Sequence, residues 1–370
     1  MKLKSVIIFS ETGVSVDITS FVEEAVIYED MGKNSLSGTI TVIDGSNLPE
    51  SVPLYGRESL GLSYLARSPN QTDTRLVENI IVFDIVSIND LSDLNLGTKV
   101  YTIEISSSVT IFNTTKSLNR RYQGSTSDIV SGILTDELNI EPELIEVEET
   151  DDYVSMIAPN VTPIQMINYL CNNTKNIDNK TFRFYQTNKK FYFRSLEEIS
   201  YDDLTWTFSY TEKKPGNKPD VERILNYTGR RRYDLLTNLN NGMYASTVIS
   251  HDIINKSLVE SEYSFPISLS YREKYLPSSR RVFQHLLDNE SVAGRMQRNA
   301  ANNVGVMMIE LYGNNMIEVG HMIGLNFPST MNVRNKAYDS MMSGRYLINK
   351  IKHVLSQQDY HMVLEVNRND

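Results

Sequence analysis

Histidine and cysteine side chains are the groups in this sequence that most directly offer chemistry, as metal ligands, proton carriers or nucleophiles. None of the five histidines stands in the His-Glu-x-x-His spacing that presents two ligands on one face of a helix. Cys171 is the only cysteine, so the chain can form neither an internal disulfide nor a cluster of thiolate ligands. We therefore assign no metal site and no cofactor. The histidines are His251, His285, His321, His353 and His361.

Three of these side chains, His353, His361 and Cys171, have neighbours in the sequence that suggest where they lie in the fold. His353 and His361 are spaced to meet across a C-terminal hairpin, although histidines on paired strands are usually ordinary half-exposed side chains. Cys171 falls on the inward face of a predicted helix, where a thiol usually fills space as a small apolar group. We expect His353 and His361 to be ordinary strand residues and Cys171 to be inert.

Catalytic motifs are missing from the sequence. It contains no Gly-x-Ser-x-Gly elbow, no Gly-x-x-x-x-Gly-Lys phosphate loop and no Gly-x-Gly-x-x-Gly fingerprint. Glycoside hydrolysis needs only two carboxylates, and the 46 acidic residues leave it open. The single tryptophan, Trp206, argues against it, because sugar clefts commonly use aromatic platforms. We assign no catalytic residue and expect no enzyme.

Charged clusters are the remaining candidates for binding. Seven acids lie within residues 141–152, where mutual repulsion favours a solvated loop or edge strand. Arginines at 230–232, with Arg223 and residues 280–281, suit either an acidic partner or a solvated strand edge. The sequence does not decide between these two, so partner-binding residues stay unassigned.

The charge balance excludes one class of function. The chain has 370 residues and a net charge of −10, which is unsuited to coating DNA by neutralising phosphates. Residues 1–210 hold 16 basic and 30 acidic residues, whereas residues 211–370 hold 20 and 16, so an acidic half adjoins a mildly basic one.

The apolar run at residues 6–9 is far too short for a signal peptide or a membrane span. We expect a protein of a reducing cytoplasm without membrane insertion.

Short strands separated by turns make up the first 120 residues. Residues 39–42 and 101–106 alternate polar and apolar side chains, a period that buries one face of a sheet and wets the other. Turn-forming residues at 44–47 and 68–70 lie between such runs. The pattern predicts a β-barrel or sandwich over residues 1–120.

The period becomes helical in residues 121–205. Ser125 and Asp128 are spaced to cap a short amphipathic helix. Thr162 and Gln165 form a second capping box, with proline at the first helical position, where its missing amide proton costs nothing. We predict two helices within a small α+β insertion domain.

Strands return before and after a second boundary. Aromatic runs flank a turn within residues 182–194 and predict a hairpin. A polar Pro/Gly linker at 211–220 follows the first strand of a second β-barrel domain, which we predict over residues 206–370. A helix is expected near 291–304, and alternating residues at 360–367 predict a closing strand.

Gly-bounded strand patterns follow one another in a fixed order along the whole chain. They lie at residues 17–22, 38–44, 53–58, 101–107, 121–134, 242–252, 313–325 and 344–353. Each pattern alone is common in β proteins. Their order and spacing resemble the baseplate central hub proteins of contractile-tailed bacteriophages, a tail hub or tube-adaptor family related to the N-terminal hub part of type VI secretion spike proteins.

The resemblance implies a mainly β, non-enzymatic structural protein. Two tube-type β-barrel domains (1–120 and 206–370) and a small α/β domain (121–205) would form a homotrimeric ring of pseudo-sixfold symmetry. Such a ring adapts a threefold central spike to the sixfold tail tube and lines the channel for DNA, which passes without specific binding.

The resemblance also implies partners and a location. The implied partners are other copies of the chain, the central spike, tail tube or tube-initiator proteins and baseplate wedge proteins. The implied location is the tail baseplate of the virion, after assembly in the host cytoplasm. A cell-wall glycoside hydrolase of the tail and a host-binding tail adhesin remain the alternatives.

Overall fold

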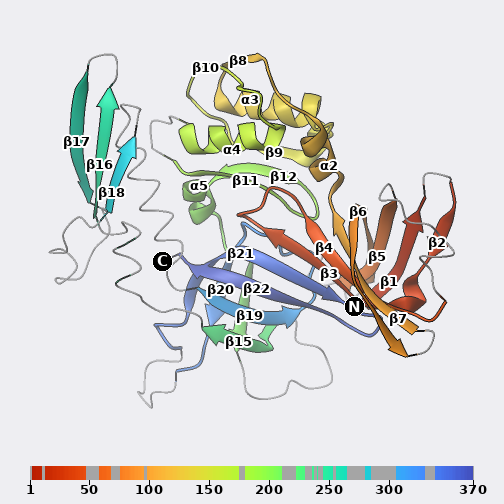
Figure 1. Ribbon diagram of the computed structural model, residues 1–370. Helices are drawn as coiled ribbons and strands as arrows, with labels where there is room; N and C mark the ends of the chain where they lie inside the picture. The colour runs from red at the N-terminus through yellow and green to blue at the C-terminus, as the bar shows by residue number, and fades with distance from the viewer. Residues whose placement is uncertain are drawn as a thin grey trace.

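The chain is described here from a computed structural model (Figure 1). The structure describes residues 2–10, 13–46, 58–67, 76–95, 98–174, 180–210, 222–229, 236, 240, 245–252, 256–264, 280–284, 306–329 and 338–369. The predicted linker at 211–220 and the predicted helix near 291–304 lie outside these residues. Within the described residues the protein is mainly β, as predicted.

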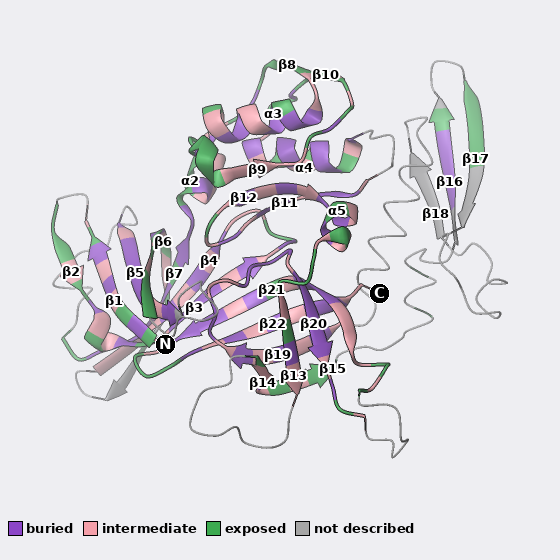
Figure 2. Ribbon diagram, turned by 180° about the vertical axis from the view of Figure 1, so that it is seen from behind, coloured by how far each residue is buried: buried purple, intermediate pink, exposed green. Residues whose placement is uncertain are grey.

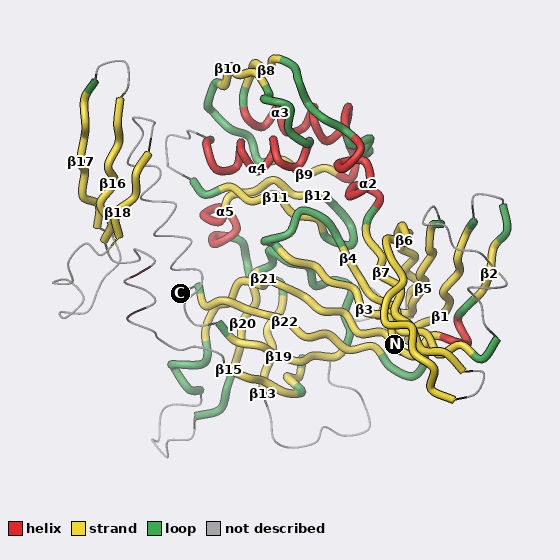
Figure 3. The backbone as a smooth tube through the Cα atoms, in the orientation of Figure 1, coloured by secondary structure: helices red, strands yellow, loops and turns green. Residues whose placement is uncertain are grey.

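One large sheet of 14 strands dominates the fold (Figure 3). Its first path runs β14-β13-β20-β21-β3-β4-β7-β6-β5-β1-β2, and β22, β19 and β15 continue from β21. The strands from the first part of the chain are β1 (Lys2–Phe9), β2 (Ser15–Asp17), β3 (Val22–Asp30), β4 (Ser37–Asp44), β5 (Ser59–Arg67), β6 (Leu76–Asn95) and β7 (Thr98–Ser106). Those from the last part are β13 (Trp206–Tyr210), β14 (Arg223–Ile224), β15 (Asn226–Gly229), β19 (Met307–Tyr312), β20 (Met322–Asn326), β21 (Gly344–Leu355) and β22 (Tyr360–Arg368).

Strands β3 and β21 join the two ends of the chain into this single sheet. They pair antiparallel, with Lys350 opposite Asp30 and Leu355 opposite Ala25. The larger of two hydrophobic clusters accordingly draws its buried side chains from residues 3–105 and 185–366 together. The two β regions expected from the sequence therefore share one core in the described part of the chain.

The strand patterns predicted from the sequence are confirmed where the structure describes them. Residues 39–42 lie in β4 and residues 101–106 in β7, each with alternating burial. In β22, Tyr360, Met362, Leu364 and Val366 are all buried. The turn predicted to begin at Asp44 is also present, because the Asp44 carboxylate accepts a hydrogen bond from the amide of Ser46 at 2.7 Å.

A small α+β unit over residues 108–201 packs above the seam of the sheet (Figure 1). Helices α3 and α4 lie over a three-stranded sheet, β11-β12-β9, and bury a second hydrophobic cluster from residues 109–193. The unit contains α2 (Ser108–Thr115), β8 (Arg121–Gly124), α3 (Thr126–Gly132), η2 (Ile133–Glu137), η3 (Pro142–Leu144), β9 (Ile145–Val147), β10 (Val154–Ile157), α4 (Pro163–Asn173), β11 (Phe182–Gln186), β12 (Phe191–Ser195) and α5 (Leu196–Tyr201).

Both predicted helix starts are confirmed. The Ser125 side chain accepts a bond from the Asp128 amide, and η2 continues α3 as one π-helical turn. Thr162 and Gln165 form the reciprocal capping box that begins α4. Within the described residues no helix is both long and apolar enough to cross a membrane.

One further sheet lies apart from these units, and one short turn lies beside the large sheet. A three-stranded sheet, β17-β16-β18, stands to one side in Figure 1, built from β16 (Ala245–Asp252), β17 (Ser257–Ser264) and β18 (Arg280–Gln284). A single 3-10 turn, η1 (Thr19–Phe21), connects β2 to β3. The strands predicted near 244–249 and 258–265 correspond to β16 and β17.

Candidate functional site

Buried polar side chains gather at the seam between β3 and β21. Glu29 on β3 and His353 on β21 are both about 1% exposed, and Oε1 of Glu29 lies 3.3 Å from Nε2 of His353. On its other side the His353 ring meets the Tyr360 hydroxyl, with 2.9 Å between Nδ1 and Oη. Burial, the largest cause, holds the pKa of Tyr360 well above its ordinary value. The Tyr360 hydroxyl therefore stays protonated at physiological pH.

The β11–β12 turn is inserted beside this seam and bound by two buried carboxylates. Glu29 accepts bonds from the amides of Asn188 (3.1 Å) and Val319 (3.3 Å). Glu318, which is 4% exposed, accepts a bond from the Thr187 hydroxyl at 2.7 Å and pairs with the ammonium of Lys189. These bonds tie the small unit to the large sheet, and we call Glu29, Glu318, Thr187, Lys189 and His353 the junction network.

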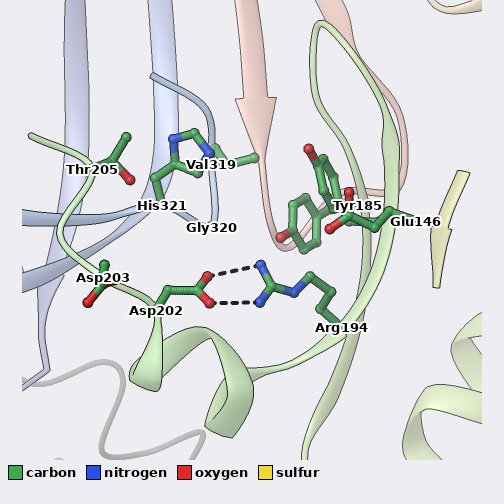
Figure 4. A pocket seen from close by; sticks show the side chains of 10 residues that line it. Glu146, Tyr185, Arg194, Asp202, Asp203, Thr205, Val319, Gly320 and His321 are labelled. Atoms are coloured by element: carbon green, nitrogen blue, oxygen red, sulfur yellow. Dashed lines mark hydrogen bonds and ion pairs between the residues drawn. The ribbon is translucent and has the colours of Figure 1, made fainter. Parts of the chain in front are cut away.

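A cavity of about 310 Å³ lies next to the junction network (Figure 4). Elements from both units form it, namely β9, β11, β12, the segment after α5 and the turn before β20. Its lining is strongly polar, with three carboxylates and one guanidinium. The lining residues are Glu146, Tyr185, Tyr192, Arg194, Asp202, Asp203, Thr205, Val319, Gly320 and His321.

An ion pair and a histidine shape the electrostatics of the cavity. Arg194 donates two bonds to the carboxylate of Asp202, each 3.0 Å long, in the bidentate geometry drawn in Figure 4. Burial lowers the pKa of His321, although Glu318 opposes that shift. Nδ1 of His321 accepts a bond from the Glu318 amide at 3.4 Å, which places the proton of the neutral ring on Nε2.

Tyrosines form one wall of the cavity. The rings of Tyr185 and Tyr192 stack with their centroids 5.3 Å apart. Gly320 has φ of +86°, and a Cβ there would lie 2.3 Å from the Tyr185 hydroxyl. Glycine is therefore required both by the backbone conformation and by the close approach of Tyr185.

A different kind of surface lies on the outward face of β1, β5 and β6. The register places Ile7, Gly61 and Val82 side by side on it; Ile80 lies next to Val82 along β6, and Val86 lies beyond Asp84 on the same face. Ile80 is 69% exposed, Val82 61% and Val86 55%, and Phe9 on β1 is also exposed. Figure 2 shows exposed stretches on β1 and β6. The opposite face carries core residues such as Val6, Leu62 and Phe83. We call Ile7, Phe9, Ile80, Val82 and Val86 the β6 face.

The structure corrects the expectation for one histidine. His353 is buried in the junction network and is not a half-exposed strand residue, because the β3–β21 pairing covers it. His361 lies opposite Val354, so its side chain projects to the other face of the sheet and the two histidines do not meet. The described residues contain no group of three metal-ligating side chains.

Cys171 lies where the sequence predicts it. It is buried on α4, and burial raises the pKa of its thiol to about 12. A thiol in this state is a poor nucleophile, which agrees with the expected inert role.

The acidic run at 141–152 contains β9, an edge strand of the β11-β12-β9 sheet, which is one of the two forms predicted for it. Glu148 accepts bonds from the amide of Ser195 (2.7 Å) and from Lys180 (2.8 Å), so it ties β9 to β12. Asp152 accepts a bond from the Thr126 amide at 2.9 Å, at the start of α3. Three of the seven acids, Glu146, Glu148 and Asp152, thus accept bonds from distant donors that the fold brings to them.

The predicted arginine cluster is only partly described. Arg223 lies in β14 and residues 280–281 begin β18, whereas residues 230–232 lie outside the described residues.

The β6 face and the cavity were not predicted from the sequence. The unbroken apolar run at residues 80–83, continued at 85 and 86, could have indicated the face, since such runs are typical of strands covered on both sides. The cavity has no comparable signal, because its lining comes from segments far apart in the sequence.

The same architecture occurs in solved structures of other proteins. No protein-family model and no curated protein matches the chain. Among solved structures, it is similar to a tail protein from Neisseria meningitidis MC58 (TM-score 0.59, 10% identity, 98% of this chain and 96% of that chain covered).

Two other solved structures are similar over nearly the whole of this chain. One is the 43 kDa tail protein of prophage MuSo2 from Shewanella oneidensis (TM-score 0.59, 9% identity, 99% and 98% covered). The other belongs to the Francisella PdpA–VgrG complex (TM-score 0.52, 8% identity, 99% of this chain but 58% of that chain). The resemblance predicted from the sequence is therefore confirmed in the fold, and this chain has a baseplate hub-like fold shared with phage tail proteins.

Proposed function

We propose that the chain is the structural hub of a phage tail baseplate. Full-length similarity to two tail proteins supports a structural tail role, with no catalytic activity. In this proposal the tube-type barrels span residues 1–120 and 206–370, with the small domain at 121–205 between them. The copies form a homotrimeric, pseudo-sixfold ring that adapts a threefold spike to the sixfold tail tube.

The β6 face is the observation that supports assembly most directly. Its apolar side chains project away from a core that already covers the other side of the strands. Contiguous exposed apolar side chains of this kind mark protein contacts. We propose that a neighbouring subunit covers the β6 face in the virion.

The difference in net charge between residues 1–210 and residues 211–370 is compatible with a ring of identical subunits. A contact between the acidic part of one copy and the mildly basic part of the next joins two different surfaces. Heterologous contacts of this type generate closed rings when the rotation closes. An acidic lumen would also repel the phosphates of passing DNA, so that DNA slides through without binding.

The proposed partners are the central spike, the tail tube or tube-initiator proteins and the baseplate wedge proteins. The similarity to a chain of a VgrG-containing complex supports a spike partner. Assembly would take place in the host cytoplasm and the product would reside in the tail of the virion.

The test is the mass of the purified protein in solution, measured by light scattering. We expect a trimer alone and a 3:3 assembly with the spike. Val82→Asp on the β6 face should dissociate the trimer, whereas the control Ile157→Asp, which alters an equally exposed residue on β10, should leave it intact. The proposal would be refuted if the protein is a monomer at all concentrations and does not bind the spike protein.

A further inference from the structure

The cavity next to the junction network lies outside the β6 face, on which the assembly proposal rests. It lies where β9, β11 and β12 of the small unit face the turn before β20. A volume of about 310 Å³ is near the lower end of the range for ligand pockets, so it suits a single small group.

The lining of the cavity carries an excess of negative charge. The only guanidinium, Arg194, is fully engaged by the carboxylate of Asp202 through two bonds. Glu146 pairs with Lys190 at 3.2 Å in a largely solvated contact, which neutralises it only weakly. Asp203 adds a third carboxylate, and His321 is held neutral by burial. An anion is therefore disfavoured in this cavity and a cation favoured.

The Tyr185 hydroxyl is a second, independent sign of a ligand. Tyr185 is 1% exposed and lines the cavity, yet its hydroxyl has no hydrogen-bond partner among the residues that the structure describes. The hydroxyl is not one of the fully buried side-chain atoms that lack a partner among the described residues, so it is accessible from the cavity, where a bound group can replace water. Stacking on Tyr192 holds the ring in place, so the hydroxyl is available as an acceptor for a bound donor.

We propose that the cavity binds one cationic side chain, an arginine or lysine, from a partner polypeptide. The charged end would donate to Asp203 and to the Tyr185 hydroxyl. The faces of tyrosine rings favour cations, which adds to the attraction. Charge complementarity identifies the occupant, since Asp203 has no cationic partner among the described residues and Glu146 is only weakly neutralised by Lys190.

The test uses N-acetylarginine amide as the probe and N-acetylcitrulline amide as its neutral isostere. Titrations of the full chain, followed by calorimetry at low ionic strength, should give saturable binding of the arginine probe with Kd on the order of 1 mM. The citrulline probe should bind at least fivefold more weakly. Asp203→Asn should weaken the arginine probe at least threefold, whereas the control Asp151→Asn, an exposed acid outside the lining, should not.

A second variant separates binding from folding. Tyr185→Phe removes only the unpartnered hydroxyl, so the thermal midpoint should stay equal to or above that of the original chain. Binding of the arginine probe should nevertheless weaken at least twofold. Equal affinity for both probes, no saturable binding of the arginine probe, or unchanged affinity in Asp203→Asn would each overturn the proposal. None of these results bears on trimer formation, which is tested separately.

Discussion

Replacing Glu318 with alanine should loosen the small unit from the large sheet. The change removes the acceptor of Thr187, a buried hydroxyl 2.7 Å away, and the partner of Lys189. A hydrogen bond to a charged group contributes about 1.5–3 kcal/mol, and without Glu318 the Thr187 hydroxyl keeps only a longer bond to the Lys190 carbonyl at 3.3 Å. The Lys189 side chain is 42% exposed and regains water, so its lost pairing adds at most about 1 kcal/mol. We expect the free energy of unfolding to fall by about 3 kcal/mol.

Urea denaturation of a double-mutant cycle measures this value. Thr187→Val alone should cost about 1 kcal/mol, and the double variant should cost about 1 kcal/mol less than the sum, because the two residues share one bond. Glu146→Ala is the matched control, since its pairing with Lys190 is far more exposed and contributes at most about 1 kcal/mol.

Hydrogen exchange locates the effect within the fold. The amide of Lys190 donates to the Thr187 hydroxyl within the β11–β12 turn, so its protection should fall in Glu318→Ala. If Glu318→Ala costs no more than Glu146→Ala, or if the cycle shows no coupling, the junction network does not hold the unit in place.

Two further predictions concern the turn before β20. Burial lowers the pKa of His321, so the unfolded chain binds a proton at this residue more readily than the folded chain does. The free energy of unfolding is therefore not reduced by this residue above pH ~6.5. It falls as the pH drops from there towards the pKa of His321 in the folded chain. His321→Gln should therefore reduce the loss of urea midpoint between pH 7.5 and 5.5, and an unchanged slope would contradict this account. Gly320→Ala should cost at least about 2 kcal/mol, from the left-handed φ and the contact with Tyr185. Thermal unfolding measures that cost, Tyr185→Phe should recover part of it, and a wild-type midpoint would count against the reasoning.

Local features were predictable where the bonds that make them lie within a few residues. The caps at Ser125 and Thr162 each depend on a side chain and an amide three positions apart, so the residue types alone indicate them. The alternation in β4, β7 and β22 follows in the same way from the period of an extended chain.

The candidate sites were not predictable by that reasoning. Glu29, Glu318 and His353 are charged or polar residues in otherwise ordinary strand and turn patterns, and nothing in their neighbours along the chain indicates burial. The β6 face looked like ordinary strand sequence, because an apolar run does not reveal which of its two faces remains uncovered.

By itself, the sequence determined the mainly β character, the helix starts and turns, and the absence of any familiar catalytic motif, because these depend on residue type and short spacing. Only the tertiary structure decided that β3 and β21 close one sheet, that Glu29 meets His353 and that Glu318 meets Thr187. Those contacts join residues that are more than a hundred positions apart. Their free energy depends on which elements bury one another, which local patterns do not record.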